Sequence, residues 1–249
     1  MQYFLGVTIL SFPHSDLADV ERDWESARAK VAAGIKNDPA GFPNTVIADL
    51  KAKPEDDVRQ SIAMLTPKAM RRSMGSKPDT AKLKAFQLEV FNIYRNAKDK
   101  HAAANVAGDV AVAAFEDKDV KTVRDMAKYL EDSREWFMLG NDGARYYSIQ
   151  QINGFAALLD GDLEAAGAFL FESTAQANGT PTLSSFGPGT RLADELLKRG
   201  EKKVVIKFLK RCREFWTLYP EKVDRWTKAL EEGRSIHEDD DWQHQFAYL

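Results

Sequence analysis

Apolar residues recur at three- and four-residue steps along most of the chain, the spacing that places side chains on one face of an α-helix. The first such stripe extends from Leu17 to Ile35, and comparable stripes cover 83–97, 102–113, 146–159 and 205–216. Apart from the apolar run at 3–12, no segment of strand length competes with these patterns. The hydrophobic pattern therefore predicts an all-α protein.

Proline and glycine mark the predicted helix boundaries. The segment "NDPAGFP" (37–43) ends the first stripe, and further helices are expected to open at Pro54 and at Thr66-Pro67, because proline is favoured in the first turn of a helix. The polar, turn-rich segment "RRSMGSKPD" (71–79) is the best candidate for a boundary. We therefore expect an N-terminal helical region at 1–75 and a second helical region at 80–249.

Short turns near Lys118, Gly161 and Gly200 each separate two helical stripes, the pattern of a helical hairpin. They lie 43 residues (118 to 161) and 39 residues (161 to 200) apart. Similar units at this period are typical of stacked helical repeats, in which each unit is too small to bury its apolar face alone. The expected architecture is a right-handed α-solenoid of antiparallel helix pairs.

The segment "INGFAALLDGDLEAAGAFL" (152–170) resembles the tetratricopeptide pattern. Gly154 matches the close-packing glycine of the first helix, Gly161 the turn, and Ala166 the small residue where the two helices cross, whereas Ala157 stands where the family has a larger residue. Roughly the last 110 residues also look like uncharacterised bacterial proteins that carry such hairpins. The resemblance implies a scaffold that binds a protein or peptide, and it carries over no catalytic residues.

The same resemblance suggests which residues bind the partner. First helices line the concave side of tetratricopeptide arrays, and this places Tyr146, Gln150, Asn153 and Arg191 on the binding surface. Tyr146 is an equally good candidate for packing between helices.

The helix at 198–216 is locally basic. Lys203 and Lys207 lie on its outer side, where basic residues usually face water but where they could also bind an acidic partner. Nucleic acid is not expected as a partner, because the formal net charge is -3.

The loop "SSFGPGT" (184–190) is the most suggestive local motif. Gly187 and Gly189 permit close backbone approach, and Thr190 and Arg191 stand at the start of the next helix, so the loop could bind a phosphate or carboxylate. The alternative is a packed helix start without a ligand. A Walker phosphate loop is excluded, since its glycine-lysine-serine/threonine ending is missing.

No pattern predicts a catalytic residue, a metal ligand set or a cofactor. The acidic tail at 237–246 lacks a fixed helical spacing of metal ligands, so we interpret it as solvated, with Trp242 folding back on the last helix. Cys212 falls on an apolar stripe, where cysteine usually acts as a small hydrophobic residue. The protein is accordingly not expected to be an enzyme.

A single cysteine excludes an intramolecular disulfide and fits a cytoplasmic protein. The alternative is export, if the apolar run 3–12 is an atypical signal; that run is too short to span a bilayer as a helix. The leading functional hypothesis is a protein-binding scaffold. Two alternatives remain: a subunit of a larger assembly that docks through 3–12, and a helical enzyme or binder of a small anion at 184–191.

Overall fold

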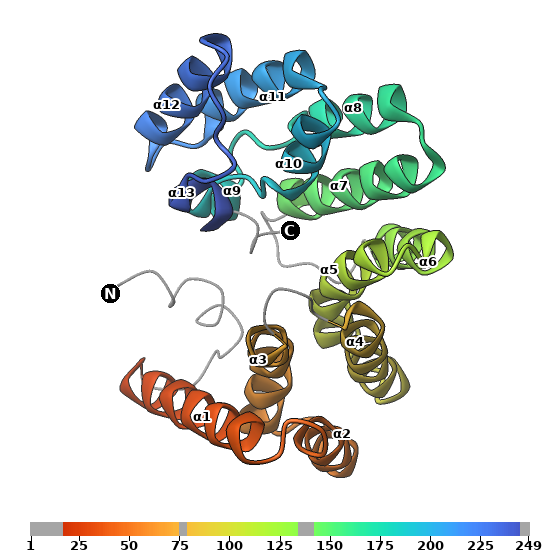
Figure 1. Cartoon of the computed structure of the whole chain (residues 1–249). Coiled ribbons are helices and arrows are strands. Elements are labelled where there is room, and N and C mark those ends of the chain that lie inside the picture. Colours follow the sequence, from red (N-terminus) through yellow and green to blue (C-terminus); the bar gives the residue numbers. More distant parts are fainter. Residues whose placement is uncertain (1–16, 75–78, 134–141, 245–249) are drawn as a thin grey trace. The chain divides into compact units, whose positions relative to one another are not determined.

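The computed structural model describes residues 17–74, 79–133 and 142–244, and every regular element in these ranges is an α-helix (Figure 1). The all-α prediction is thereby confirmed for the described residues. The apolar run 3–12 and residues 75–78 of the proposed boundary segment 71–79 lie outside them.

The described helices fall into two compact units that divide between Asp99 and Lys100. The first contains α1 (Leu17–Asn37), α2 (Phe42–Ala52), α3 (Asp57–Ser73) and α4 (Thr80–Asn96). The second contains α5 (Lys100–Glu116), α6 (Val120–Asp132), α7 (Asp142–Asp160), α8 (Leu163–Glu172), α9 (Pro181–Phe186), α10 (Arg191–Lys198), α11 (Lys202–Phe215), α12 (Pro220–Glu231) and α13 (Asp240–His244).

Helix α4 belongs to the first unit. The sequence interpretation put the boundary within 71–79, where the chain is polar and rich in turn residues. Helix α4 follows that connection but packs against α2 and α3. Composition marks where the chain turns, whereas the side chains that α4 buries decide which helices it joins.

Helix α3 corrects one expected boundary. Pro67 lies inside α3 and does not start a new helix, so the expected start at Thr66-Pro67 is wrong. Proline removes one backbone hydrogen bond at this point. Ile62, Ala63 and Met70, before and after it, are all buried, so the helix gains more by continuing its apolar face than it loses at the proline.

The three turns that the sequence singled out each hold a residue in the left-handed region. The φ angles are 60° at Lys118, 81° at Gly161 and 88° at Gly200, and each turn ends one helix just before the next begins. Lys98, at the end of α4, has the same conformation with φ 61°. Glycine adopts this region without strain, whereas a lysine pays a conformational cost there.

Hydrogen bonds around Gly161 show how one turn both ends and begins a helix. The Gly161 N–H donates to the Leu158 carbonyl (3.2 Å) and the Asp162 N–H donates to the Ala157 carbonyl (2.9 Å), which closes α7. The Asp162 carboxylate then accepts from the Ala165 N–H (2.8 Å) and caps α8. The break in the sequence at 160–162 is therefore a structural device.

In the second unit, helices that follow one another pack side by side. Helix α5 packs on α6, α6 on α7, α7 on α8, and α11 on α12, while α8 also lies against α10 and α11 (Figure 1). Each of these helices thus buries its apolar face mainly against its neighbours along the chain.

Two close contacts hold the end of the second unit in place. Gly154 of α7 meets α10 so closely that an added Cβ would lie 2.3 Å from Leu192 Cδ2. The indole rings of Trp216, Trp226 and Trp242 form a continuous cluster, with centroid separations of 6.0 and 5.2 Å. Trp242 is fully buried, which confirms that it folds back on α12.

Candidate functional site

An open groove lies between α8 and α11, which are neighbours in the second unit. Its volume is about 380 Å³. The lining side chains come from the two helices and from the residue that precedes α11: Leu163, Glu164, Gly167, Ala168, Phe171, Glu201, Val204 and Lys207. We name this feature the α8–α11 groove.

The floor of the α8–α11 groove consists of small and apolar residues, namely Gly167 and Ala168 of α8 and Val204 of α11. A Cβ on Gly167 would lie 3.4 Å from the Val204 methyl groups, which is an ordinary van der Waals distance. Phe171 also lines the groove, and its residue surface is 42% exposed. A large exposed aromatic side chain in a concave site is typical of a surface that binds another molecule.

Phe171 is a functional candidate that the sequence reasoning missed. The segment 163–171 carries apolar or small residues around nearly the whole helix, whereas a helix that buries a single face keeps a polar side. That signal was present in the sequence and indicates a second contact face on α8.

Lys207, which was predicted to bind a partner, does line this groove. Lys203, one turn before it on α11, is also exposed but lies outside the lining. Glu164 and Glu201 add two carboxylates to the walls. The groove therefore combines an apolar floor with charges of both signs.

Three of the other predicted partner-binding residues, Tyr146, Gln150 and Asn153, lie on α7. The Tyr146 hydroxyl donates to Glu172 of α8, so this side chain bridges the two helices of one pair. Gln150 and Asn153, further along α7, are both half-buried. None of the three lines the α8–α11 groove.

The glycines of the predicted anion loop serve packing. Gly187 has φ 83°, and a Cβ there would lie 2.4 Å from the Trp216 ring. The Gly189 carbonyl accepts a hydrogen bond from the buried Tyr147 hydroxyl (2.6 Å). Burial raises the pKa of Tyr147 well above its ordinary value, so the hydroxyl stays protonated and able to donate.

Thr190 and Arg191, the other two residues of the predicted anion site, are also engaged within the protein. The fully buried Thr190 donates its hydroxyl to the Trp242 carbonyl (3.0 Å). Arg191 forms an ion pair with Glu116 of α5 in a half-buried setting. Residues 187–190 are all buried, and the observed role of the loop is to connect α9 and α10 with α13.

Asp194 of α10 is the centre of a buried polar cluster. Its carboxylate accepts from Trp242 Nε1 (3.0 Å) and lies 2.5 Å from His237 Nδ1 and 2.8 Å from Lys198 Nζ. Burial by itself would raise the pKa of Asp194, but the hydrogen bonds from Lys198, Trp242 and His237 outweigh it and lower that pKa below its ordinary value. The cluster ties the C-terminal segment to α10.

Within the described ranges, no group of three or more His, Cys, Asp or Glu side chains is placed to hold a metal ion. Cys212 is fully buried on α11, and this burial raises the pKa of its thiol well above the ordinary value. A thiol in that state is a poor nucleophile, because the thiolate is the reactive form.

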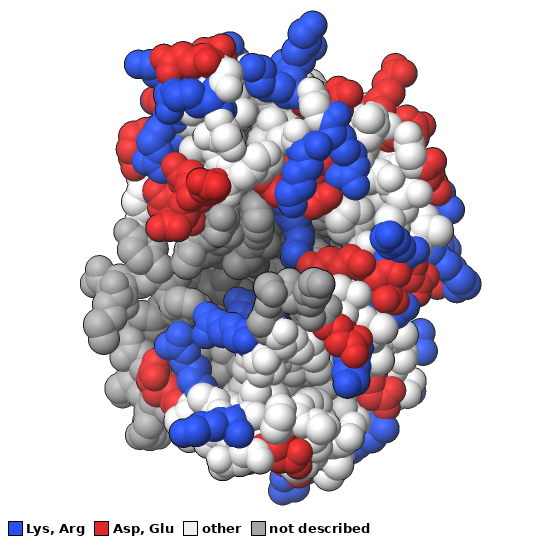
Figure 2. All heavy atoms as spheres, viewed as in Figure 1, with Lys and Arg blue, Asp and Glu red and all other residues white. Residues whose placement is uncertain are grey.

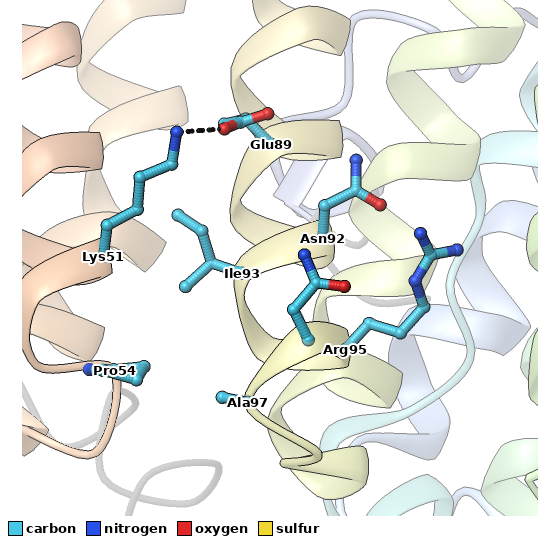
Figure 3. A pocket seen from close by; sticks show the side chains of 8 residues that line it. Lys51, Pro54, Glu89, Asn92, Ile93, Arg95 and Ala97 are labelled. Carbon is cyan, nitrogen blue, oxygen red and sulfur yellow. Dashed lines mark ion pairs between the residues drawn. The ribbon is translucent and has the colours of Figure 1, made fainter.

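A second, more polar pocket of about 650 Å³ lies between α2 and α4 in the first unit (Figure 3). Lys51 of α2 and Glu89 of α4 form an ion pair across it (2.6 Å), and Ile93 projects from α4 below them. Asn92 and Arg95 continue the wall along α4. Lys51 and Glu89 are already paired with each other, so these charges offer less to a ligand than those of the α8–α11 groove.

The surface charge is mixed. Figure 2 shows acidic and basic side chains interspersed over the visible face. In the part of the chain that the structure describes, no helix has the length and apolarity needed to cross a membrane.

Comparison of the chain with protein-family models, with curated proteins and with solved structures finds no match.

Proposed function

We propose that this protein is a non-catalytic scaffold that binds a protein or peptide, and that its second unit is a right-handed α-solenoid of antiparallel, tetratricopeptide-like helix pairs. The packing of α5 to α8 in chain order supports the solenoid, as do the equivalent turns at Lys118, Gly161 and Gly200. Stacked pairs of this kind present ridged surfaces on which side chains stand at fixed spacings.

The exposure of Phe171 in the α8–α11 groove carries this proposal. Burying an exposed aromatic ring against a partner releases about 25 cal/mol for each Å² of apolar surface removed from water. Rings of this size act as anchors in protein interfaces, where a few buried aromatic residues supply most of the affinity. Phe171 is thus the residue on which binding should depend most.

The shape of the groove favours a protein segment over a small molecule. Small-molecule sites typically bury most of the ligand's surface within a concave cavity. The α8–α11 groove is open and runs between two helices, so it can accept a side chain from a larger partner whose remaining surface rests on the rims.

The test compares Phe171→Ser with Leu218→Ser in the full chain. Leu218 is the matched control because it is also an exposed large apolar residue of the second unit (56% exposed), yet it does not line the groove. Each immobilised variant is incubated with extract of the source cells, and retained proteins are quantified by mass spectrometry. We expect Phe171→Ser to lose specific partners that both the wild type and Leu218→Ser retain. Equal retention by all three proteins would refute the proposal.

A further inference from the structure

The charges along the α8–α11 groove are ordered. Gly167 of α8 and Val204 of α11 face each other in the groove, and Figure 1 shows that the two helices run in the same direction there. Glu164 and Glu201 precede this contact, whereas Phe171 and Lys207 follow it. One end of the groove is therefore acidic, and the other combines an aromatic ring with a cation.

The basic residues in the second half of α11, beyond the groove, form ion pairs within the protein. In the second half of α11, Lys210 pairs with Glu231 of α12 (2.7 Å) and Arg213 with Asp224 of α12 (3.1 Å). The remaining cation of that half, Arg211, pairs with an acid on its own helix.

Glu164, Glu201, Lys203 and Lys207 have no ion-pair partner among the described residues. Glu164, Glu201 and Lys207 line the groove between α8 and α11, whereas Lys203 lies one turn before Lys207 and outside the lining. Exposed charges that are ordered along a groove and lack internal partners can select a partner of complementary charge.

We propose that the occupant of the groove is a short protein segment in which an apolar side chain stands between a basic residue and an acidic residue. The apolar side chain packs against Phe171 and Val204, the basic residue faces Glu164 and Glu201, and the acidic residue faces Lys207. This inference rests on the proposed function, because it specifies which segments that binding surface accepts.

The length of the groove sets the spacing of the two charges. Glu201 and Lys207 are six residues apart on α11, and at about 1.5 Å per residue the charged ends lie roughly 9 Å apart along the helix axis. A helical segment covers that distance with about six residues, and an extended segment covers it with about three, at roughly 3.3 Å each. The two conformations thus predict different sequence motifs.

The experiment selects peptides from a random phage-displayed library on the purified full chain. We expect the enriched peptides to share one apolar residue flanked by a basic and an acidic residue at one of the two spacings. Their affinity, measured by fluorescence anisotropy with the synthetic peptide, should fall as salt rises, because exposed ion pairs are screened.

Charge reversal supplies the decisive comparison. Glu164→Lys with Glu201→Lys should weaken the selected peptide roughly tenfold, the factor that two or three exposed ion pairs supply. A peptide whose basic residue is replaced by glutamate should regain affinity for that variant. The matched control reverses two exposed acids outside the groove, Glu221→Lys with Glu238→Lys, and should bind the original peptide like the wild type.

The outcomes separate this inference from the proposed function. Peptides that need Phe171 but show no charge pattern, or that ignore the reversal at Glu164 and Glu201, overturn the inference and leave the scaffold proposal standing. A library that yields no peptide dependent on Phe171 overturns both.

Discussion

Asp194 offers the most direct test of how the second unit is held together. Its side chain is only 4% exposed, and it accepts hydrogen bonds from Trp242 and Lys198 and contacts His237. Replacing Asp194 with alanine removes the common acceptor and leaves three donors behind. We expect this to be among the most destabilising single changes in the unit.

The magnitude follows from how far each donor is buried. The Trp242 indole N–H has no route to water, and an unsatisfied buried donor costs about 1–3 kcal/mol. Lys198 and His237 are 51% and 37% exposed, so both can turn to solvent, and each should lose less than about 1 kcal/mol. Together these losses give about 3 kcal/mol for Asp194→Ala. Asp194→Asn, which keeps one acceptor oxygen, should lose less.

Urea denaturation followed by tryptophan fluorescence measures this loss. Trp216, Trp226 and Trp242 lie in one cluster next to Asp194, so their emission reports on this region. Asp224→Asn is the control, since Asp224 makes an exposed ion pair and should change stability by less than about 0.5 kcal/mol. If Asp194→Ala unfolds at the same urea concentration as the control variant, the assigned role of the cluster is incorrect.

The pH dependence adds an independent check. The pKa of Asp194 is lower in the folded protein than its ordinary value near about 3.9, so the unfolded chain binds the proton more readily. The stabilising contribution is therefore fully present above about pH 4 and is lost as the pH falls through the folded pKa. The stability difference between wild type and Asp194→Asn should be constant near neutral pH and shrink below about pH 4; a difference that grows in acid would contradict the argument.

Three substitutions and one labelling experiment test the turns and the buried thiol. Gly161→Ala should cost about 1 kcal/mol, because φ is 81° and the space beside it is open. Gly187→Ala should cost at least about 3 kcal/mol in the same urea assay, since a similar φ is combined with a clash against Trp216; equal losses at the two glycines would refute the packing assigned to the loop. Lys118→Gly should raise the free energy of unfolding by up to about 1 kcal/mol, because glycine adopts the left-handed conformation without strain. Cys212 should react with a thiol reagent only after unfolding, and rapid reaction of the native protein would show that it is not buried as observed.

Local sequence signals predicted much of the fold. The apolar stripe from Leu17 to Ile35 became α1, and the turn residues at Lys118, Gly161 and Gly200 end helices as expected. These features depend on side-chain spacing and backbone preference over a few residues, which the sequence displays directly. Pro67 shows the limit of such signals, because packing on both sides of it overrode the local preference for a helix start.

The candidate site was predicted only in part. Lys207 was expected to bind a partner because a basic stripe is visible in the sequence, and it does line the groove. Phe171 was missed, because the apolar residues around α8 indicate a second contact face but do not show which of them stays exposed. The loop at 184–190 was predicted to bind an anion because of its glycines. The Gly187 backbone instead packs against Trp216, a residue almost thirty positions away that a local motif does not reveal.

The sequence by itself determined that this protein is helical and where most of its helices break, because periodicity and turn chemistry act between residues close together in the chain. Only the tertiary structure decided that α4 belongs with the first three helices, that Asp194 holds the C-terminal segment, and that α8 and α11 leave a groove between them. The physical reason is that these features arise from contacts between side chains distant in sequence, whose pairing is fixed only when the apolar faces of whole helices are buried together.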